Sequence, residues 1–447
     1  MTNIHVNDVE EKITGAIRGN ANSLSLYGYH NGQLLPKTLL DIPGLRHLSL
    51  EHFYMNMPAW LANLAFLESL EIEETGSVKE IVPLLWKLDK LRKLKLAYAG
   101  LESLPSSLVR LEQLEELNVD GADFEAFPAV IASLTSLRSF SYAHCYCALP
   151  EVFNGLSALP RLKKLRLSSY ADEEAGHFLP ESFCRLQAIE ELHFNDWIDL
   201  QELPECIGNM RNLRVIKVSN DDHPDYLAAI KELPDSLGNL VNLEELDVYG
   251  LQDLKQFSPS FSRLSRLKRL DTKGSGIDEL QLTAEQWKNL EELHMHGPLP
   301  DLRQCVNLKK FAWFKNQVGI YRGGIPHGTD EVISLPLSPL RNLESLSIMG
   351  GALDSTDFLA SMANLRNLHL SCDFESFPNG FEKLDKLEEI SIWGAKSLTA
   401  LPEYLGHLPS LKKLYLTACG VQSLPKSIRE RKDLHIDVRH CPVQWPE

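Results

Sequence analysis

The sequence predicts an α/β solenoid in which one short unit is stacked many times. The stretch at 401–416, LPEYLGHLPSLKKLYL, returns with the same spacing of Leu and Pro at 104–119, 203–218 and 233–248. Strand motifs of this kind begin about every 23 residues between residues 45 and 411, and a fixed period of that length is typical of a solenoid.

Two spacings inside the unit define its local structure. Leu414 and Leu416 are two residues apart, as on one face of a strand, whereas Leu405, Leu408 and Leu411 are three apart, as on one side of a tight helical turn. Each unit is therefore expected to be a short strand, a bend and a helical or 3₁₀ return. All of its leucines point inward, so no unit can bury them without a neighbour on each side.

This pattern resembles the leucine-rich repeat family, specifically the intracellular type with LPxxLxxLxxLxxLxL units. Ras-group-related scaffolds, the sensor regions of plant resistance proteins and bacterial leucine-rich repeat effectors share it. The resemblance implies a curved horseshoe with a parallel sheet on the concave face and short helices or 3₁₀ turns on the convex face. It also implies a non-enzymatic protein-recognition module, which could serve as a scaffold, a sensor or a host-directed effector.

One family feature is only partly present. The ninth position of each unit in that family is often Asn, whose side chain bonds to loop backbone groups in a ladder. Here the position holds Thr75, Ala99, Ala122, Cys145, Asp373, Ala395 and Cys419. The missing hydrogen bonds are expected to come from backbone groups or water.

The expected organisation has three parts. Val9, Ile13 and Ile17 lie four apart and give residues 7–18 one apolar face, so residues 1–20 are assigned to a helix that caps the array. Residues 21–438 form the repeat array, and 439–447 form a C-terminal tail or cap. No further domain boundary is expected within the array.

Composition restricts the partner and the location. The net charge of −16 disfavours nucleic acid, which requires a basic surface, and favours a neutral or basic protein or peptide. No apolar run is long enough to span a membrane, and the acidic N-terminal stretch does not read as a signal peptide. The eight cysteines are scattered, which favours the cytoplasm, with delivery into a host cell as the alternative.

Insertions interrupt the period at 170–178, 219–232 and 315–334. Each follows a strand, so it is expected to lie at the edge where strands leave the concave face, and long loops of this kind are often functional. A small ligand held under the 315–334 loop is an alternative function. The short unit at 298–308 is expected to lack its return helix.

Side chains at the third, fifth, seventh and eighth positions of each strand motif are expected to face outward. In the later repeats this surface becomes aromatic and apolar, and exposed groups of that kind are typical anchors of protein interfaces. The predicted partner-binding residues are Tyr249, His294, His296, Phe314, Met349, His369, Trp393 and Tyr415. The alternative is that the 315–334 loop folds back and buries some of them.

One constellation suggests different chemistry. His294 and His296 lie on one strand, and Asp271 is expected beside His294, so the three could hold a metal ion in a metal-dependent enzyme. Solvated face residues are the favoured interpretation, as is a structural role for Cys145 and Cys147. No Ser/His/Asp or Cys/His arrangement can be assembled. The sequence therefore predicts no catalytic residue, no metal and no cofactor.

Overall fold

The computed structural model describes residues 6–28, 34–145, 148–169, 178–194, 197, 200–219, 230–315 and 332–444. The chain divides into two compact units, residues 1–216 and 217–447. Each alternates short strands with short helices, and all the strand pairings given below are parallel. None of the helices described is long and apolar enough to cross a membrane.

The first unit begins with helix α1 (Val6–Gly19). Its strands are β1 (Ser23–Tyr27), β2 (His47–Glu51), β3 (Ser69–Glu73), β4 (Lys93–Ala97), β5 (Glu116–Asn118), β6 (Ser139–Cys145), β7 (Lys164–Ser169) and β8 (Glu191–His193). Consecutive strands pair from β1 to β8. The helices between them are η1 (Lys37–Asp41), η2 (Ala59–Asn63), η3 (Val82–Lys87), η4 (Ser106–Arg110), η5 (Ala129–Ser133), α2 (Leu149–Leu156), η7 (Glu181–Arg185) and η8 (Glu205–Asn209).

Strand β9 (Val215–Lys217) lies at the boundary, and the second unit continues in the same way. Its strands are β10 (Glu245–Asp247), β11 (Arg269–Asp271), β12 (Glu292–His296), β13 (Lys310–Phe314), β14 (Val332–Ile333), β15 (Ser345–Leu353), β16 (Asn367–Asp373), β17 (Glu389–Trp393), β18 (Lys413–Thr417) and β19 (His435–Arg439). Its helices are η9 (Asp235–Asn239), η10 (Pro259–Arg263), α3 (Ala284–Asn289), η11 (Leu302–Gln304), η13 (Asp357–Ser361), η14 (Phe381–Lys383), η15 (Glu403–His407) and α4 (Lys426–Arg429).

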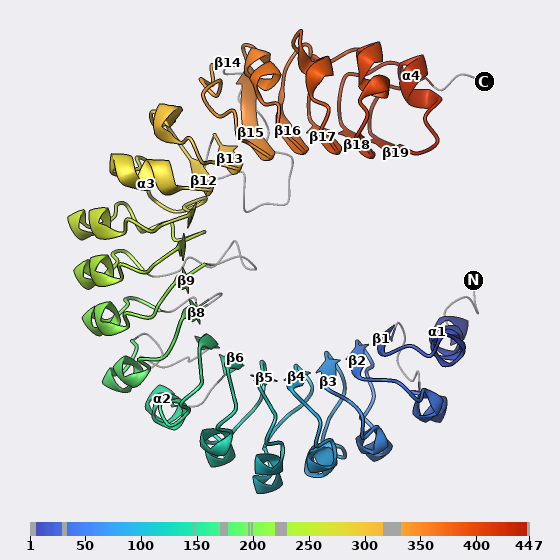
Figure 1. The fold of residues 1–447 in the computed structure, drawn as a ribbon, viewed down its shortest axis with the longest axis vertical. Coiled ribbons are helices and arrows are strands. Elements are labelled where there is room, and N and C mark those ends of the chain that lie inside the picture. Colours follow the sequence, from blue (N-terminus) through green and yellow to red (C-terminus); the bar gives the residue numbers. More distant parts are fainter. Residues whose placement is uncertain are drawn as a thin grey trace. The chain divides into compact units, whose positions relative to one another are not determined.

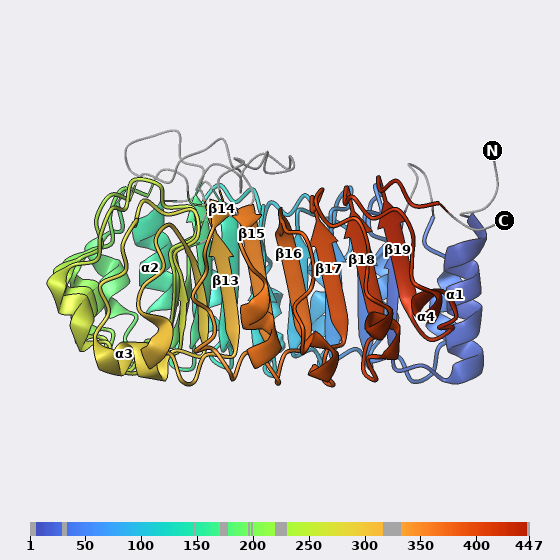
Figure 2. The ribbon, with the colours of Figure 1, turned by 90° about the horizontal axis from the view of Figure 1, so that it is seen from above.

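Within each unit the helices line one side of the strands, and none of the described helices covers the other side, which we call the open face (Figure 1, Figure 2). We number each repeat from the first Leu of its L-x-x-L-x-L motif. Positions 4 and 6 point toward the helices, as Leu246 and Val248 do with 1% and 0% of their surface exposed. Positions 5 and 7, such as Asp247 and Tyr249, alternate with them and face the open side. The predicted repeat solenoid with a parallel sheet is confirmed.

The Leu-Pro step explains why most returns are 3₁₀ turns. Pro105, Pro204 and Pro402 each precede such a helix with extended backbone, for example φ −73° and ψ 146° at Pro402. Proline fixes φ and donates no N–H, so it fits at a helix start and cannot continue the preceding strand. The turn then ends after about five residues, as is usual for 3₁₀ structure.

The short unit at 298–308 keeps a return, so the expectation that it lacks one is wrong. One 3₁₀ turn, η11 (Leu302–Gln304), replaces the usual five residues. The Asp301 side chain caps it by accepting a hydrogen bond from the backbone N–H of Arg303 at 3.1 Å. Leu302 then fills the inward position with 3% of its surface exposed.

Helix α1 occupies the segment that the sequence assigns to a cap. Val9 and Ile13 are buried, and the helix packs against β1 and η1. The helix thereby covers leucines of the first repeat that would otherwise be exposed to solvent. The limits assigned to the array and to the C-terminal tail stay predictions.

Asparagine side chains link neighbouring repeats where the strands begin. The Asn289 amide donates to the Ser265 carbonyl at 2.9 Å, and the Asn342 amide donates to the Val306 carbonyl at 2.6 Å. Both residues directly precede a strand motif, nine positions before the site at which the family ladder is expected. Asparagines outside the substituted ninth position therefore provide a separate set of hydrogen bonds from side chains to the backbone.

Charge alternates at position 2 of the strand motif, with one break in the first unit. The first unit has Arg46, Glu68, Arg92, Glu115, Arg138, Lys163, Glu190 and Arg214, in which Lys163 follows Arg138 with the same sign; the second unit has Glu244, Lys268, Glu291, Lys309, Glu344, Arg366, Glu388 and Lys412. Neighbours form ion pairs, such as Arg92 with Glu115 at 2.8 Å and Lys412 with Glu388 at 2.7 Å. Each exposed pair contributes at most about 1 kcal/mol. Together they favour one order of repeats.

Asp120 is a buried carboxylate at the end of β5, with 2% of its surface exposed. It accepts hydrogen bonds from the Ala143 N–H and the Ser141 hydroxyl at 2.7 Å, and from the Asn118 amide at 3.0 Å. The Arg166 guanidinium, two strands away, donates to it at 2.7 Å. This carboxylate therefore holds β5, β6 and β7 together.

A disulfide joins Cys184 in η7 to Cys206 in η8, with their Cα atoms 5.7 Å apart. The cysteines are scattered along the sequence, but Cys184 and Cys206 lie 22 residues apart and so occupy equivalent places in successive repeats. Cys305, Cys372, Cys419 and Cys441 are free thiols. The side chain of Cys145 and residue Cys147 lie outside the described residues.

Substitution of Leu246 by Asp is expected to lower the free energy of unfolding by about 3–5 kcal/mol, because it places an unpaired charge in the core. Denaturant unfolding followed by circular dichroism measures the change. Val241→Asp, at a position 52% exposed in the same repeat, is the matched control and should change stability by less than about 0.5 kcal/mol. Equal stability of the two variants would show that the inward positions are misassigned.

Asp120→Ala should destabilise the first unit by about 3 kcal/mol, because one buried and two partly buried donors and a partly buried guanidinium lose their acceptor. The exposed Asp123→Ala is the control. Thermal unfolding of both variants tests the expectation. An unchanged midpoint for Asp120→Ala would contradict the structural role of this carboxylate.

Candidate functional site on the open face of the second unit

The position-7 side chains of the second unit form a row along its open face. The row consists of Tyr249, Lys273, His296, Phe314, Met349, Ser371, Trp393, Thr417 and Arg439. Strand register places His296 beside Phe314, Phe314 beside Met349, and Trp393 beside Thr417. We call these nine residues the position-7 row.

The first part of the row is an aromatic pair with a cation between its members. The Lys273 ammonium lies 4.4 Å from the centre of the Tyr249 ring and 5.1 Å from the centre of the Phe314 ring. Tyr249 is half-buried, whereas Phe314 is 9% exposed and His296 only 3%. Of the two predicted aromatic anchors, only Tyr249 offers much surface.

The last part of the row surrounds a cavity of about 540 Å³. Its lining residues are Trp393, Thr417, Ala418, Arg439 and His440. The Arg439 guanidinium is held by Asp437, with Nη2 at 2.6 Å from Oδ2 and Nε at 3.0 Å from Oδ1. A mainly apolar hollow with one fixed cation therefore lies at the ends of β17, β18 and β19.

Trp393, which lines this hollow, and Tyr415, on the neighbouring strand β18, are both predicted partner-binding residues. The Tyr415 ring packs edge-on against His435, with centroids 5.7 Å apart, and leaves its own face half-exposed. The indole N–H of Trp393 is buried and meets no acceptor among the described residues. No hydrogen bond to the described residues therefore fixes the Trp393 ring, although buried Trp N–H groups usually have an acceptor.

His294, at position 5 in strand β12, lies between two carboxylates. Its Nδ1 is 2.7 Å from Asp271 Oδ2 and its Nε2 is 3.3 Å from Glu292 Oε1. Burial alone would lower the pKa of His294, but the hydrogen bonds to Asp271 and Glu292 raise it to about 9. The hydrogen bond to His294 likewise holds the pKa of Glu292 at about 2. His294 is therefore an imidazolium in a charged cluster at neutral pH.

His369, also at position 5, behaves in the opposite way. Burial lowers its pKa, and Glu389 only partly offsets that effect. The difference arises because His294 contacts two carboxylates directly, whereas His369 feels one at a distance. Identical positions in the repeat thus carry differently charged histidines.

The structure brings Asp271 and His294 together as predicted, but it separates His296 from them. Among the described residues, the carboxylate that lies within 4.0 Å of the His296 ring is Asp278, at 4.0 Å from Nε2. Both ring nitrogens of His294 already face carboxylates, so neither is free for a metal ion. In the described part of the chain no group of three or more His, Cys, Asp or Glu residues could hold one.

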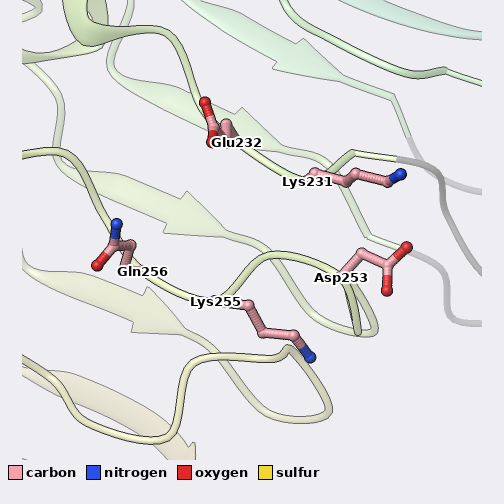
Figure 3. A pocket seen from close by; sticks show the side chains of 5 residues that line it. All are labelled: Lys231, Glu232, Asp253, Lys255 and Gln256. Carbon is pink, nitrogen blue, oxygen red and sulfur yellow. The ribbon is translucent and has the colours of Figure 1, made fainter.

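A second hollow, of about 360 Å³, lies between two connecting segments (Figure 3). Its lining side chains are Lys231, Glu232, Asp253, Lys255 and Gln256, all polar and exposed. Figure 3 shows them spread over the two segments instead of converging on one point. Small-molecule sites are usually apolar with a few converging polar groups, so this hollow does not resemble one.

Met349, Trp393 and Tyr415 are half-exposed on the open face, so the geometry leaves them available as predicted. Sequence reasoning missed Lys273 and Arg439 as site residues, although both occupy position 7. Position alone could have identified them, but not the reach of Lys273 over two rings. Residues 170–177, 220–229 and 316–331, which include most of the three predicted loops, lie outside the described residues.

Comparison with known proteins identifies the repeat. Residues 87–203 match the model of a leucine-rich repeat region. The volume-regulated anion channel subunit LRRC8B of Mus musculus is 32% identical over 145 residues, which are 32% of this chain and 18% of that subunit. The Homo sapiens subunit of the same name is 27% identical over 258 residues, 56% of this chain and 28% of its own length. The chain thus spans less than a third of these relatives.

Among solved structures, a leucine-rich repeat protein of Leptospira interrogans is similar over 96% of this chain and 93% of its own. The identity is 18% and the TM-score 0.48. This likeness concerns the fold only.

The His294 cluster predicts a pH dependence of stability. Its pKa is raised from 6.5 to about 9 by folding, so its contribution is fully present below pH 6.5 and is lost as pH rises through about 9. His294→Gln should therefore lower the free energy of unfolding by about 1–2 kcal/mol at pH 6, after allowance for solvent screening, and much less at pH 9.5. Denaturant unfolding at the two pH values measures the difference.

His369→Gln is the matched control with the opposite sign. Because the pKa of His369 is lowered, the wild type should lose stability relative to this variant as pH falls below 6.5. The same pH trend in both variants would contradict the assigned charge states.

Proposed function

Because this chain folds as a leucine-rich repeat solenoid and part of it matches the model of that family, we propose that it is a non-enzymatic recognition module. It binds a protein or peptide on the open face of its second unit. The observation that carries this proposal is the position-7 row, in which Met349 and Trp393 are half-exposed on a face that no helix of the described residues covers. Aromatic residues and Met on such a surface are typical interface anchors.

The cavity beside Trp393 supports the same proposal. It offers a hollow into which an apolar side chain fits, with the Arg439 guanidinium at its border. Anchors that enter hollows and exclude water supply most of the energy of protein interfaces. A neutral or basic partner suits the net charge of −16, and the same charge disfavours nucleic acid.

The metal-dependent enzyme is not favoured by this geometry, since both ring nitrogens of His294 already contact carboxylates. The cytoplasmic location, or delivery into a host cell, stays a proposal. The Cys184–Cys206 disulfide favours an oxidising compartment instead. The redox state of these two cysteines in protein isolated from its native source distinguishes the cytoplasmic location from an oxidising compartment.

A paired-variant capture experiment tests the binding surface. Trp393→Ser with Tyr415→Ser removes two anchors from the second unit, and each loss should weaken binding about tenfold or more. Tyr54→Ser with Phe66→Ser removes two exposed aromatic side chains of the first unit and is the matched control. All proteins are checked for equal unfolding midpoints before use.

The wild type and the control pair are expected to capture the same protein, and purified partner should then bind the Trp393/Tyr415 pair at least tenfold more weakly. Equal affinity for all three would place the binding surface elsewhere. A partner lost only by the Tyr54/Phe66 pair would assign the function to the first unit.

A further inference from the structure

The Lys273 side chain is held in a fixed place on the open face. The Lys273 N–H donates to Asp271 Oδ1 at 2.9 Å, and its carbonyl accepts from the Gly250 N–H at 3.0 Å. The backbone on either side of the side chain is therefore pinned. Contacts with the Tyr249 and Phe314 rings, at 4.4 and 5.1 Å, then fix the ammonium.

Cations on the open face of the second unit are generally paired with carboxylates. Lys217 and Arg269 contact Glu245, Lys310 contacts Glu292, and Lys413 contacts Glu389. Arg439 and His294 have Asp437 and Asp271. Lys273 differs, since no carboxylate of the described chain lies within 4.0 Å of its ammonium.

The rings do not replace a carboxylate. A cation–π contact contributes about 0.5–1 kcal/mol at an exposed site, and it satisfies none of the three N–H donors of an ammonium by an ordinary hydrogen bond. Meanwhile Tyr249 and Phe314 shield two sides of the group from water. A charge partly stripped of water next to aromatic surface gains most from an incoming opposite charge.

The surrounding charges allow an anion to approach. Asp271, the carboxylate two residues away, is 2.7 Å from the His294 ring. Because the pKa of His294 is raised to about 9 by that contact and by Glu292, the imidazolium offsets the Asp271 charge at neutral pH. An anion reaching Lys273 therefore meets Asp271 already paired with the imidazolium, and the Lys310 ammonium, 3.3 Å from Glu292, offsets the second carboxylate of the cluster.

We propose that the Lys273 ammonium, held between the Tyr249 and Phe314 rings, receives the carboxylate of an Asp or Glu side chain of a protein partner. An apolar residue beside that acid packs on the exposed part of Tyr249. The partner thus carries a local acidic and apolar motif, whatever its overall charge. This inference rests on the proposed function, because it concerns the same open face and specifies what is recognised there.

The probe is a library of random 12-residue peptides displayed on phage and selected on the whole chain. Each selected peptide is synthesised as found and with every Asp and Glu changed to Asn and Gln. Dissociation constants are measured for the wild type and for Lys273→Met, which keeps the length of the side chain and removes the charge. Lys310→Met is the matched control, because it removes a cation that already has Glu292.

Selected peptides are expected to contain an acid next to an apolar residue, and their neutral versions should bind the wild type at least tenfold more weakly. Lys273→Met should bind both versions equally, Lys310→Met should discriminate as the wild type does, and Lys273→Arg should restore the preference.

Peptides that need Trp393 and Tyr415 but show no preference for an acid would overturn this inference and leave the proposed function standing. A selection that yields no peptide dependent on the open face would overturn both. Single-stranded RNA that binds through Lys273, in the absence of peptide binding, would replace the peptide partner with a nucleic acid.

Discussion

No repeat of this chain can bury its own leucines, and this constraint organises the whole molecule. Leu246 pairs in register with Leu270, and Leu270 with Leu293, so each position-4 leucine is covered by those of the adjacent repeats. All three are at most 1% exposed. Positions 4 and 6 supply this core. Side chains at positions 5 and 7 are not needed to form it, so their chemistry can vary from repeat to repeat.

The fold was predictable because its determinants are local and repeated. The spacing of Leu414 and Leu416 defines a strand, and the Leu-Pro step defines the start of a 3₁₀ turn. The error at 298–308 has the same physical origin, since a single capped turn is too short to show a period of three. The Asn289 and Asn342 bonds were missed because the known ladder lies at another position.

The site was less predictable, because its properties depend on neighbours that are distant in sequence. Position 7 is outward by alternation, yet His296 and Phe314 are buried, so alternation along the strand does not by itself determine exposure. Lys273 was visible only as one of several polar residues in a row that also contains aromatic residues and Met. Its ammonium contacts two aromatic rings because of the conformation of the side chain, and the repeat period does not specify that conformation. His294 and His369 likewise differ only through the carboxylates that adjacent repeats place beside them.

The alternating charges at position 2 limit how the array can change length. Loss of the single repeat that contains Lys268 would set Glu244 beside Glu291, and neighbouring like charges on adjacent strands are destabilising. Loss of two consecutive repeats would instead restore a Glu next to a Lys or Arg. Gain or loss of repeats by recombination should therefore be tolerated best in pairs. In the second unit the sign of the charge at position 2 thus distinguishes one repeat from the next, whereas the leucines are alike in all of them.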